Sequence, residues 1–92
     1  MIRSLKGRGL RRLYSEGETG GIRGDLVAQV ERILTVLESA SSPQAVNLPS
    51  FRLHALKGNR KGYWAVTVRA NWRIIFRFQD GDVWDVELVD YH

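Results

Sequence analysis

The hydrophobic residues of this chain change their spacing halfway along the sequence, from a helical repeat to the pattern typical of β-strands. Between residues 25 and 40, apolar residues recur at helical spacing, which predicts a helix that buries one face. From residue 51 onward, short runs of aromatic and β-branched residues are separated by turn-forming residues, which predicts strands. This order favours an α+β fold, in which two N-terminal helices pack on one face of an antiparallel, largely meander β-sheet.

Local signals give the expected boundaries. We expect a short edge strand at 2–4, helices at 5–15 and 25–40 with a glycine-rich loop at 17–24 between them, a helical turn at 43–47, strands at 51–56, 63–69, 72–79 and 82–90, and turns at 58–62, 70–71 and 80–81. Ser4 and Asp25 are the expected N-caps of the two helices, because their side chains can accept a backbone N–H. Gly7 and Gly9 weaken the first helix.

The Asp80-Gly81 pair predicts a tight hairpin between the last two strands. A two-residue turn there would place Phe76 opposite Asp85, whereas a longer loop would place Arg77 opposite Asp85. The second pairing is chemically better, so we expect a β-bulge or a longer turn in this hairpin.

The net charge of +4 is unevenly distributed along the chain. Five basic residues lie within the first twelve positions and seven more lie between Arg52 and Arg77, while no acid occurs between Glu38 and Asp80. From Asp80 to the end there are five acids and no lysine or arginine. Cross-strand ion pairs explain part of this pattern. The remaining positive charge indicates an anionic partner, such as nucleic acid, an acidic protein or an anionic membrane surface.

Several classes of protein and site are disfavoured. The chain has no cysteine, so it has no disulfide framework and no thiolate metal site. It has no apolar stretch long enough to span a bilayer and no signal peptide, so we expect one cytoplasmic domain over residues 1–92. Walker, HExxH and GxSxG motifs are missing, and only two histidines are present. We therefore expect neither a cofactor nor a catalytic metal.

RNA cleavage is one reaction that these residues could carry out without a metal. It needs a general base, a general acid and cations that stabilise the phosphorane. The sheet half of the chain contains residues of these types: His54, His92, Lys57, Arg69 and Arg73, with Tyr91 able to stack on a base. A lone histidine on a strand is more often structural, and a terminal histidine more often belongs to a frayed tail. The residue types alone therefore indicate a basic α+β domain, with RNA binding as one option.

Three segments of the sequence extend this interpretation. They are the N-terminal MIRSLKGRGLRRLYSEG, the central NLPSFRLHALKGNRKGYWAV and the C-terminal ANWRIIFRFQDGDVWDVELVDYH, which ends in Asp-Tyr-His. Together they span nearly the whole chain, and they resemble the HigB (also called GraT) group of plasmid-maintenance killer toxins in the RelE superfamily. One departure is Ala70, which stands where this group is expected to have glycine.

The resemblance implies an activity and partners. Members of this group look like ribosome-dependent mRNA endonucleases that cut message in the ribosomal A site, leaving a 2′,3′-cyclic phosphate and a 5′-hydroxyl. The partner implied is a HigA-type antitoxin with a helix-turn-helix domain, through which the toxin–antitoxin complex would bind operator DNA. The ribosome and mRNA are the other expected partners, and a membrane is not.

The resemblance also assigns roles to individual positions. The family's active-site positions correspond to His54, Asp90, Tyr91 and His92. The two histidines are expected to share the acid–base work, Asp90 to orient or polarise a neighbour, and Tyr91 to stack on the nucleotide. Other basic residues are the candidates for RNA contact: Lys57, Arg69 and Arg73 for the reacting phosphate, and Arg8, Arg11 and Arg12 on the first helix for ribosomal RNA.

Two other functions compete with this one. The RelE superfamily also contains ParE-type toxins that poison DNA gyrase without being enzymes. That branch lacks the terminal Asp-Tyr-His and the paired histidines, so their presence here argues against it. The second alternative is a plain RNA- or protein-binding module with inactive histidines.

Overall fold

A four-stranded antiparallel sheet forms the centre of the computed structural model, which describes residues 1–91; His92 lies outside the described residues. The helices are α1 (Arg8–Glu16) and α2 (Val27–Ser39), and the strands are β1 (His54–Ala55), β2 (Trp64–Arg69), β3 (Trp72–Gln79) and β4 (Asp82–Asp90). Short 3₁₀ turns occupy Gly24–Leu26, Pro43–Val46, Pro49–Phe51 and Gly58–Arg60. The strand order β1-β2-β3-β4 is a meander. The structure thus has the antiparallel α+β fold that the sequence predicts.

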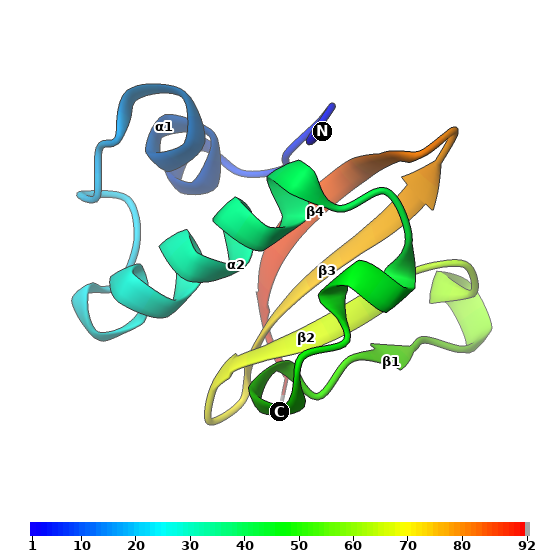
Figure 1. The fold of residues 1–92 in the computed structure, drawn as a ribbon. Helices are drawn as coiled ribbons and strands as arrows, with labels where there is room; N and C mark the ends of the chain where they lie inside the picture. Colours follow the sequence, from blue (N-terminus) through cyan, green and yellow to red (C-terminus); the bar gives the residue numbers. More distant parts are fainter. Residues whose placement is uncertain (92) are drawn as a thin grey trace.

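Helix α2 runs across one face of the sheet, and α1 lies beside α2 next to the N-terminal segment (Figure 1). The buried stripe of α2 consists of Val30, Ile33, Leu34 and Leu37, the residues whose spacing predicts the helix. They share one hydrophobic core with inward-facing strand residues, among them Phe76. No helix among the described residues is long and apolar enough to cross a membrane.

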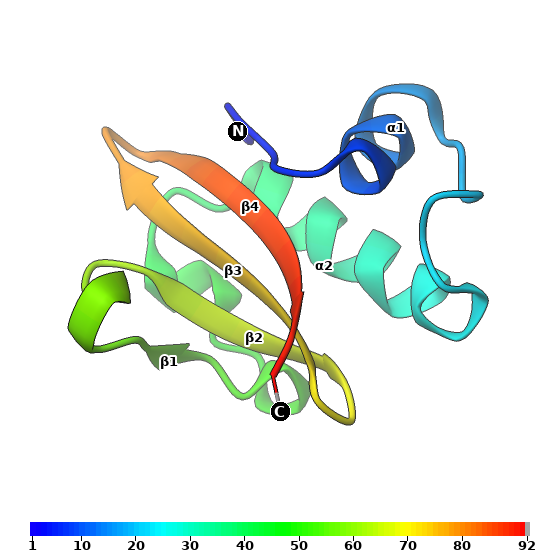
Figure 2. The same cartoon turned by 180° about the vertical axis from the view of Figure 1, so that it is seen from behind.

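The other face of the sheet carries no α-helix within residues 1–91 and is called the open face here (Figure 2). Side chains alternate between the two faces along each strand. Ile74 and Phe76 belong to the core cluster on the helix side, so Arg73 and Ile75 lie on the open face. This side of the sheet is the one that an extended ligand can reach.

The expected cap at Ser4 is wrong, because this side chain bonds elsewhere. Its Oγ accepts the Asp85 N–H at 2.8 Å and donates to the Asp85 carboxylate at 3.2 Å. Helix α1 therefore begins only at Arg8, after Gly7, whose φ of 87° suits glycine. The edge strand expected at residues 2–4 corresponds to parallel bridges of Ile2 and Leu5 to β4.

Asp25 is not the cap of α2 either. It lies in the 3₁₀ turn that precedes the helix, and no side-chain cap is present at the helix start. Its carboxylate instead pairs with Arg23 at 2.7 Å and with Arg69 at 3.7 Å. Asp25 therefore joins the loop before α2 to the end of β2.

The first expected strand is shorter than predicted. Residues 51–56 contain only the two-residue strand β1. Pro49 starts a 3₁₀ turn that buries Phe51 completely, and Arg52 then has a left-handed φ of 51°. This residue turns the chain before it can pair, so β1 is short.

The β3–β4 hairpin has both a two-residue turn and a bulge. Gln79 pairs with Asp82 across the Asp80-Gly81 turn, and Arg77 pairs with Trp84. The register then shifts at Asp85, whose φ is 55°. The bulge brings the Asp85 carboxylate to 2.7 Å from the Nε of Arg77, so the expected bulge and the expected ion pair are both confirmed.

Candidate functional site

The C-terminal tripeptide continues the strand geometry of β4 as far as the described residues go. Asp90 is the last residue of β4 and pairs with Trp72. Beyond it, the Tyr91 N–H donates to the backbone oxygen of Asn71 at 2.8 Å. The side chain of Tyr91 remains 37% exposed. Asp90 and Tyr91 are therefore held by their backbone while the ring of Tyr91 stays accessible; His92, the third expected member, lies outside the described residues.

Asp90 and Tyr91 extend toward opposite faces of the sheet, since consecutive strand residues alternate. Asp90 lies on the helix side, at a hollow of about 220 Å³ where the sheet meets the loop before α2. The hollow is lined by Arg23, Asp25, Leu26, Arg69, Ala70, Asn71, Trp72 and Asp90. Tyr91 extends from the open face. The two expected site residues are thus neighbours in sequence with different surroundings.

His54 lies on β1, where it pairs with Ala65 and is exposed. Its Nδ1 is 3.1 Å from the backbone oxygen of Arg52. A carbonyl oxygen can only accept, so this contact requires the proton on Nδ1. In the neutral ring, Nε2 is then the unprotonated nitrogen and can accept a proton from a ligand. The contact with the Arg52 carbonyl therefore favours the neutral tautomer with the proton on Nδ1 and leaves Nε2 as the acceptor.

His54 and Tyr91 share the open face. Directly paired residues in neighbouring strands have their side chains on the same side, and Ala65 pairs in turn with Ile75 on the open face. Strands β1 and β4 lie three strand spacings apart, which is about 14 Å in a flat sheet, and Tyr91 is four residues beyond Glu87, the β4 residue in the row of His54, which adds about 13 Å along the strand. Arg73, on β3, lies on the same face between them. The structure thus brings three expected site residues onto one accessible surface.

The other expected phosphate-binding residues have different positions. Arg73 is fixed by hydrogen bonds from Nη1 to the backbone oxygens of Ala70 at 2.6 Å and Trp72 at 3.0 Å. Lys57 is exposed directly before the 3₁₀ turn that follows β1. Arg69 lies on the helix side beside Asp25, with Asp90. Arg73 therefore shares the open face with His54, Lys57 lies in the turn after β1, and Arg69 is grouped with Asp90.

The arginines of α1 form a separate cationic surface. Arg8, Arg11 and Arg12 line an open hollow together with Ser15 and Glu16. The first turn of α1 contains no acid and its last turn no base, so the charges are arranged against the helix dipole. In both views α1 lies at the upper end of the molecule and the C-terminal end of β4 at the lower end (Figures 1 and 2). These arginines are not part of the surface that carries His54 and Tyr91.

One hollow on the open face contains residues that sequence analysis did not single out. It measures about 250 Å³ and is lined by Lys6, Asn59, Arg60, Tyr63, Ile75 and Glu87. Ile75 and Glu87 pair with each other in the row of the sheet that contains Ala65 and His54. The basic turn at residues 58–62 was the available signal, but the sequence could not show that Lys6 from the N-terminal segment lies beside it. Within residues 1–91, no group of three or more His, Asp or Glu side chains could hold a metal ion.

Comparison with known proteins identifies the family to which the chain belongs. The sequence model for the RelE-like toxin of type II toxin-antitoxin system HigB matches residues 3–92. The chain is 41% identical over 92 residues to Endoribonuclease HigB of Proteus vulgaris, covering 100% of both proteins. Both findings confirm the resemblance inferred from the sequence.

Solved structures support the fold. YafQ from E. coli is similar with a TM-score of 0.65 at 15% identity, covering 98% of this chain and 91% of that chain. A mutant toxin from Helicobacter pylori is similar with a TM-score of 0.55 at 18% identity, covering 98% of this chain and 94% of that one. With the fold, the family match and the full-length relative in agreement, the chain belongs to the HigB family of RelE-like toxins of type II toxin–antitoxin systems.

Proposed function

We propose that the chain is an endoribonuclease toxin that cuts messenger RNA in the A site of a translating ribosome and so inhibits translation. The name of the Proteus vulgaris relative, which matches over its full length, supports the ribonuclease activity. The structural observation that carries the proposal is the open face, where His54, Arg73 and Tyr91 share one accessible surface of a chain with a net charge of +4. An RNA segment lying across β2 and β3 would contact all three.

The proposed reaction is attack of the ribose 2′-hydroxyl on the neighbouring phosphate, without a metal. A general base removes the hydroxyl proton, the oxygen forms a bond to phosphorus, and the bond to the 5′-oxygen breaks. A general acid protonates that leaving oxygen, which gives a 2′,3′-cyclic phosphate and a 5′-hydroxyl. Nε2 of His54 fits the base, because the Arg52 carbonyl contact leaves it as the acceptor. His92 is the proposed acid, and the two histidines exchange roles if the RNA binds in the opposite direction.

The remaining site residues have supporting roles in this proposal. Tyr91 stacks on a base, since its ring is exposed while its backbone is fixed. Arg73 and Lys57 stabilise the phosphorane charge. Asp90 lies on the helix side with Arg69, so we assign to both a positioning role through neighbouring groups.

The proposed partners follow from the same assignment. Arg8, Arg11 and Arg12 would grip ribosomal RNA through its phosphates, which explains why α1 keeps charges that oppose its dipole. A HigA-type antitoxin would neutralise the toxin and connect it to operator DNA. A ribosome-dependent enzyme would act in the cytoplasm.

Mapping of message 5′ ends after induced expression tests the proposal. The wild-type chain should arrest growth and produce cuts within A-site codons. His54→Ala should lower cutting by about 100-fold or more, the range for loss of a general acid or base. Glu18→Ala, in an exposed loop away from the sheet, is the matched control and should cut like wild type.

Two results would contradict it. Cutting that survives in His54→Ala at the wild-type rate would remove His54 from the mechanism. Growth arrest with intact messages and DNA damage would instead indicate a ParE-like poison of DNA gyrase.

A further inference from the structure

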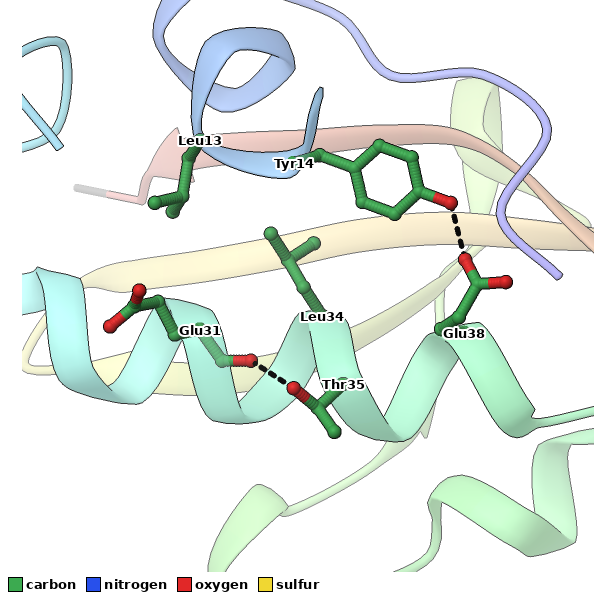
Figure 3. Close-up of a pocket in the computed structure, with 6 residues that line it drawn as sticks. All are labelled: Leu13, Tyr14, Glu31, Leu34, Thr35 and Glu38. Atoms are coloured by element: carbon green, nitrogen blue, oxygen red, sulfur yellow. Dashed lines mark hydrogen bonds between the residues drawn. The ribbon is translucent and has the colours of Figure 1, made fainter. Parts of the chain in front are cut away.

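A groove between α1 and α2 lies outside the surface assigned to RNA (Figure 3). It has a volume of about 320 Å³ and is lined by Leu13, Tyr14, Glu31, Leu34, Thr35 and Glu38. Leu13 and Leu34 form its apolar floor and are almost fully buried. Glu31, Thr35 and Glu38 line it from one side of α2, because residues three, four and seven positions apart share a helix face. The groove thus combines an apolar floor with an acidic rim.

The rim is fixed before any ligand binds. The Tyr14 hydroxyl donates to the Glu38 carboxylate, which also accepts the Ile2 N–H at 3.3 Å. These contacts connect α1, α2 and the N-terminal segment, and they hold the ring of Tyr14 in place while 38% of it remains exposed. A rigid, partly exposed tyrosine offers contact area at a low entropy cost, which is why tyrosine is frequent in protein interfaces.

The charge of the groove opposes that of the rest of the chain. The hydrogen bond from Tyr14 lowers the pKa of Glu38 and keeps its carboxylate ionised. The Glu31 carboxylate is exposed and has no ion pair with the residues that the structure describes. The two carboxylates repel RNA phosphates that come close to the groove, because salt screens charges only beyond a distance of about 8–10 Å. A toxin of a type II system has an antitoxin as a protein partner. The acidic rim therefore fits the protein partner and not the nucleic acid.

We propose that the groove between α1 and α2 is a docking surface for the antitoxin, which places an apolar side chain over Leu13 and Leu34 and a lysine or arginine between Glu31 and Glu38. The apolar floor supplies the contact area and the two carboxylates select a cationic residue. The proposal rests on membership of a toxin–antitoxin family and not on the catalytic mechanism. A failure of the proposed cleavage mechanism would therefore leave the docking proposal unaffected.

Binding of the purified cognate antitoxin to the full-length toxin tests the proposal. Both toxin variants carry His54→Ala, which makes expression tolerable, and affinity is measured by titration calorimetry. Glu31→Lys should weaken binding by about tenfold or more, because it opposes a cation on the partner. Glu18→Lys makes the same charge change outside the groove and should stay within about twofold of the parent. Equal affinity of the two variants, or equal weakening, would overturn the proposal.

A second measurement separates protein docking from RNA binding. Without the His54 substitution, and in a translating extract that lacks antitoxin, Glu31→Lys should cut message at the wild-type rate. A change in cutting together with unchanged antitoxin affinity would assign the groove to RNA and overturn the proposal. Because Glu31 is exposed and has no ion pair among the described residues, both lysine variants should keep the circular dichroism spectrum and unfolding midpoint of the parent.

Discussion

In the first half of β4, the side chain of Asp85 is held by three others, whereas Tyr91, directly after the strand, is held within residues 1–91 only through its backbone. The Asp85 carboxylate accepts hydrogen bonds from Arg77 at 2.7 Å, Tyr63 at 3.1 Å and Ser4 at 3.2 Å. Tyr91 makes one backbone bond to Asn71 and leaves its ring exposed.

The two ends of β4 therefore have different roles, one in stability and one in ligand binding. Polar side chains that bond to each other stabilise the fold but are not free to bind a ligand. A side chain on a fixed backbone keeps its binding capacity. We therefore expect substitutions at the Asp85 end to affect stability and substitutions at the Tyr91 end to affect cutting, and the following predictions test that division.

The largest effect is expected at the accessible end. Tyr91→Ala should lower message cutting by about 10- to 100-fold, because loss of a stacked base costs about 1–3 kcal/mol. Tyr91→Phe keeps the ring and should retain most of the cutting. The free energy of unfolding should be unchanged in both, since the bond to Asn71 uses only the backbone. A Phe variant as inactive as the Ala variant would replace stacking with a role for the hydroxyl.

At the bonded end, Asp85→Asn should lower the free energy of unfolding by about 1–3 kcal/mol, because it removes the charge that Arg77 pairs with. Asparagine tolerates the left-handed backbone at this bulge, so the substitution tests the charge and not the φ of 55°. Asp80→Asn is the matched control, since Asp80 also has a positive φ of 53° but is exposed in the turn. Urea denaturation of both variants measures the difference, and an equal loss in the control would assign it to the backbone.

The stability difference between wild type and Asp85→Asn should depend on pH. The hydrogen bond from Arg77, reinforced by Tyr63 and Ser4, lowers the pKa of Asp85. A depressed pKa gives stability that is fully present above the ordinary carboxyl range and is lost as the pH falls through the folded-state value. The difference should therefore be constant from about pH 7 to 5 and shrink below about pH 4. A difference that stays constant down to pH 2 would contradict this linkage.

The smallest effect concerns the turn that supports Tyr91. Ala70 has a left-handed φ of 50°, a conformation that glycine adopts without strain. Ala70→Gly should stabilise the chain by about 0.5–1 kcal/mol and leave cutting unchanged. Ala28→Gly, in the first turn of α2, should instead destabilise it by up to about 1 kcal/mol. Loss of cutting in Ala70→Gly would show that the strained turn positions the tripeptide.

The left-handed φ of Ala70 accounts for the glycine that was expected at this position, and nothing in the structure explains the alanine. Most of the sheet was predictable from local sequence signals. Strands β3 and β4 have the expected bounds, because turn residues and β-forming side chains there agree. The bulge and the ion pair between Asp85 and Arg77 were predictable too, although Arg77 lies opposite Trp84 in the register and not opposite Asp85 as expected.

The two capping predictions failed for a shared reason. Ser4 and Asp25 have the right side chains for N-caps, but both side chains bind other groups: Ser4 bonds to Asp85, far away in the sequence, and Asp25 pairs closely with Arg23 and more distantly with Arg69. Local propensity cannot weigh such partners. The short β1 was missed because the left-handed turn at Arg52 has no glycine to announce it.

The sequence by itself determined the α+β class, the main helix, the last three strands and, through its resemblance, the family and the candidate residues of the site. The tertiary structure decided how those candidates are distributed. It placed His54, Arg73 and Tyr91 on the open face, Asp90 and Arg69 on the helix side, and the acidic groove between α1 and α2. The physical reason is that side-chain spacing within one strand or helix is fixed by its local geometry. Which faces and edges meet depends on the register and on partners distant in the chain, and only the folded molecule contains them.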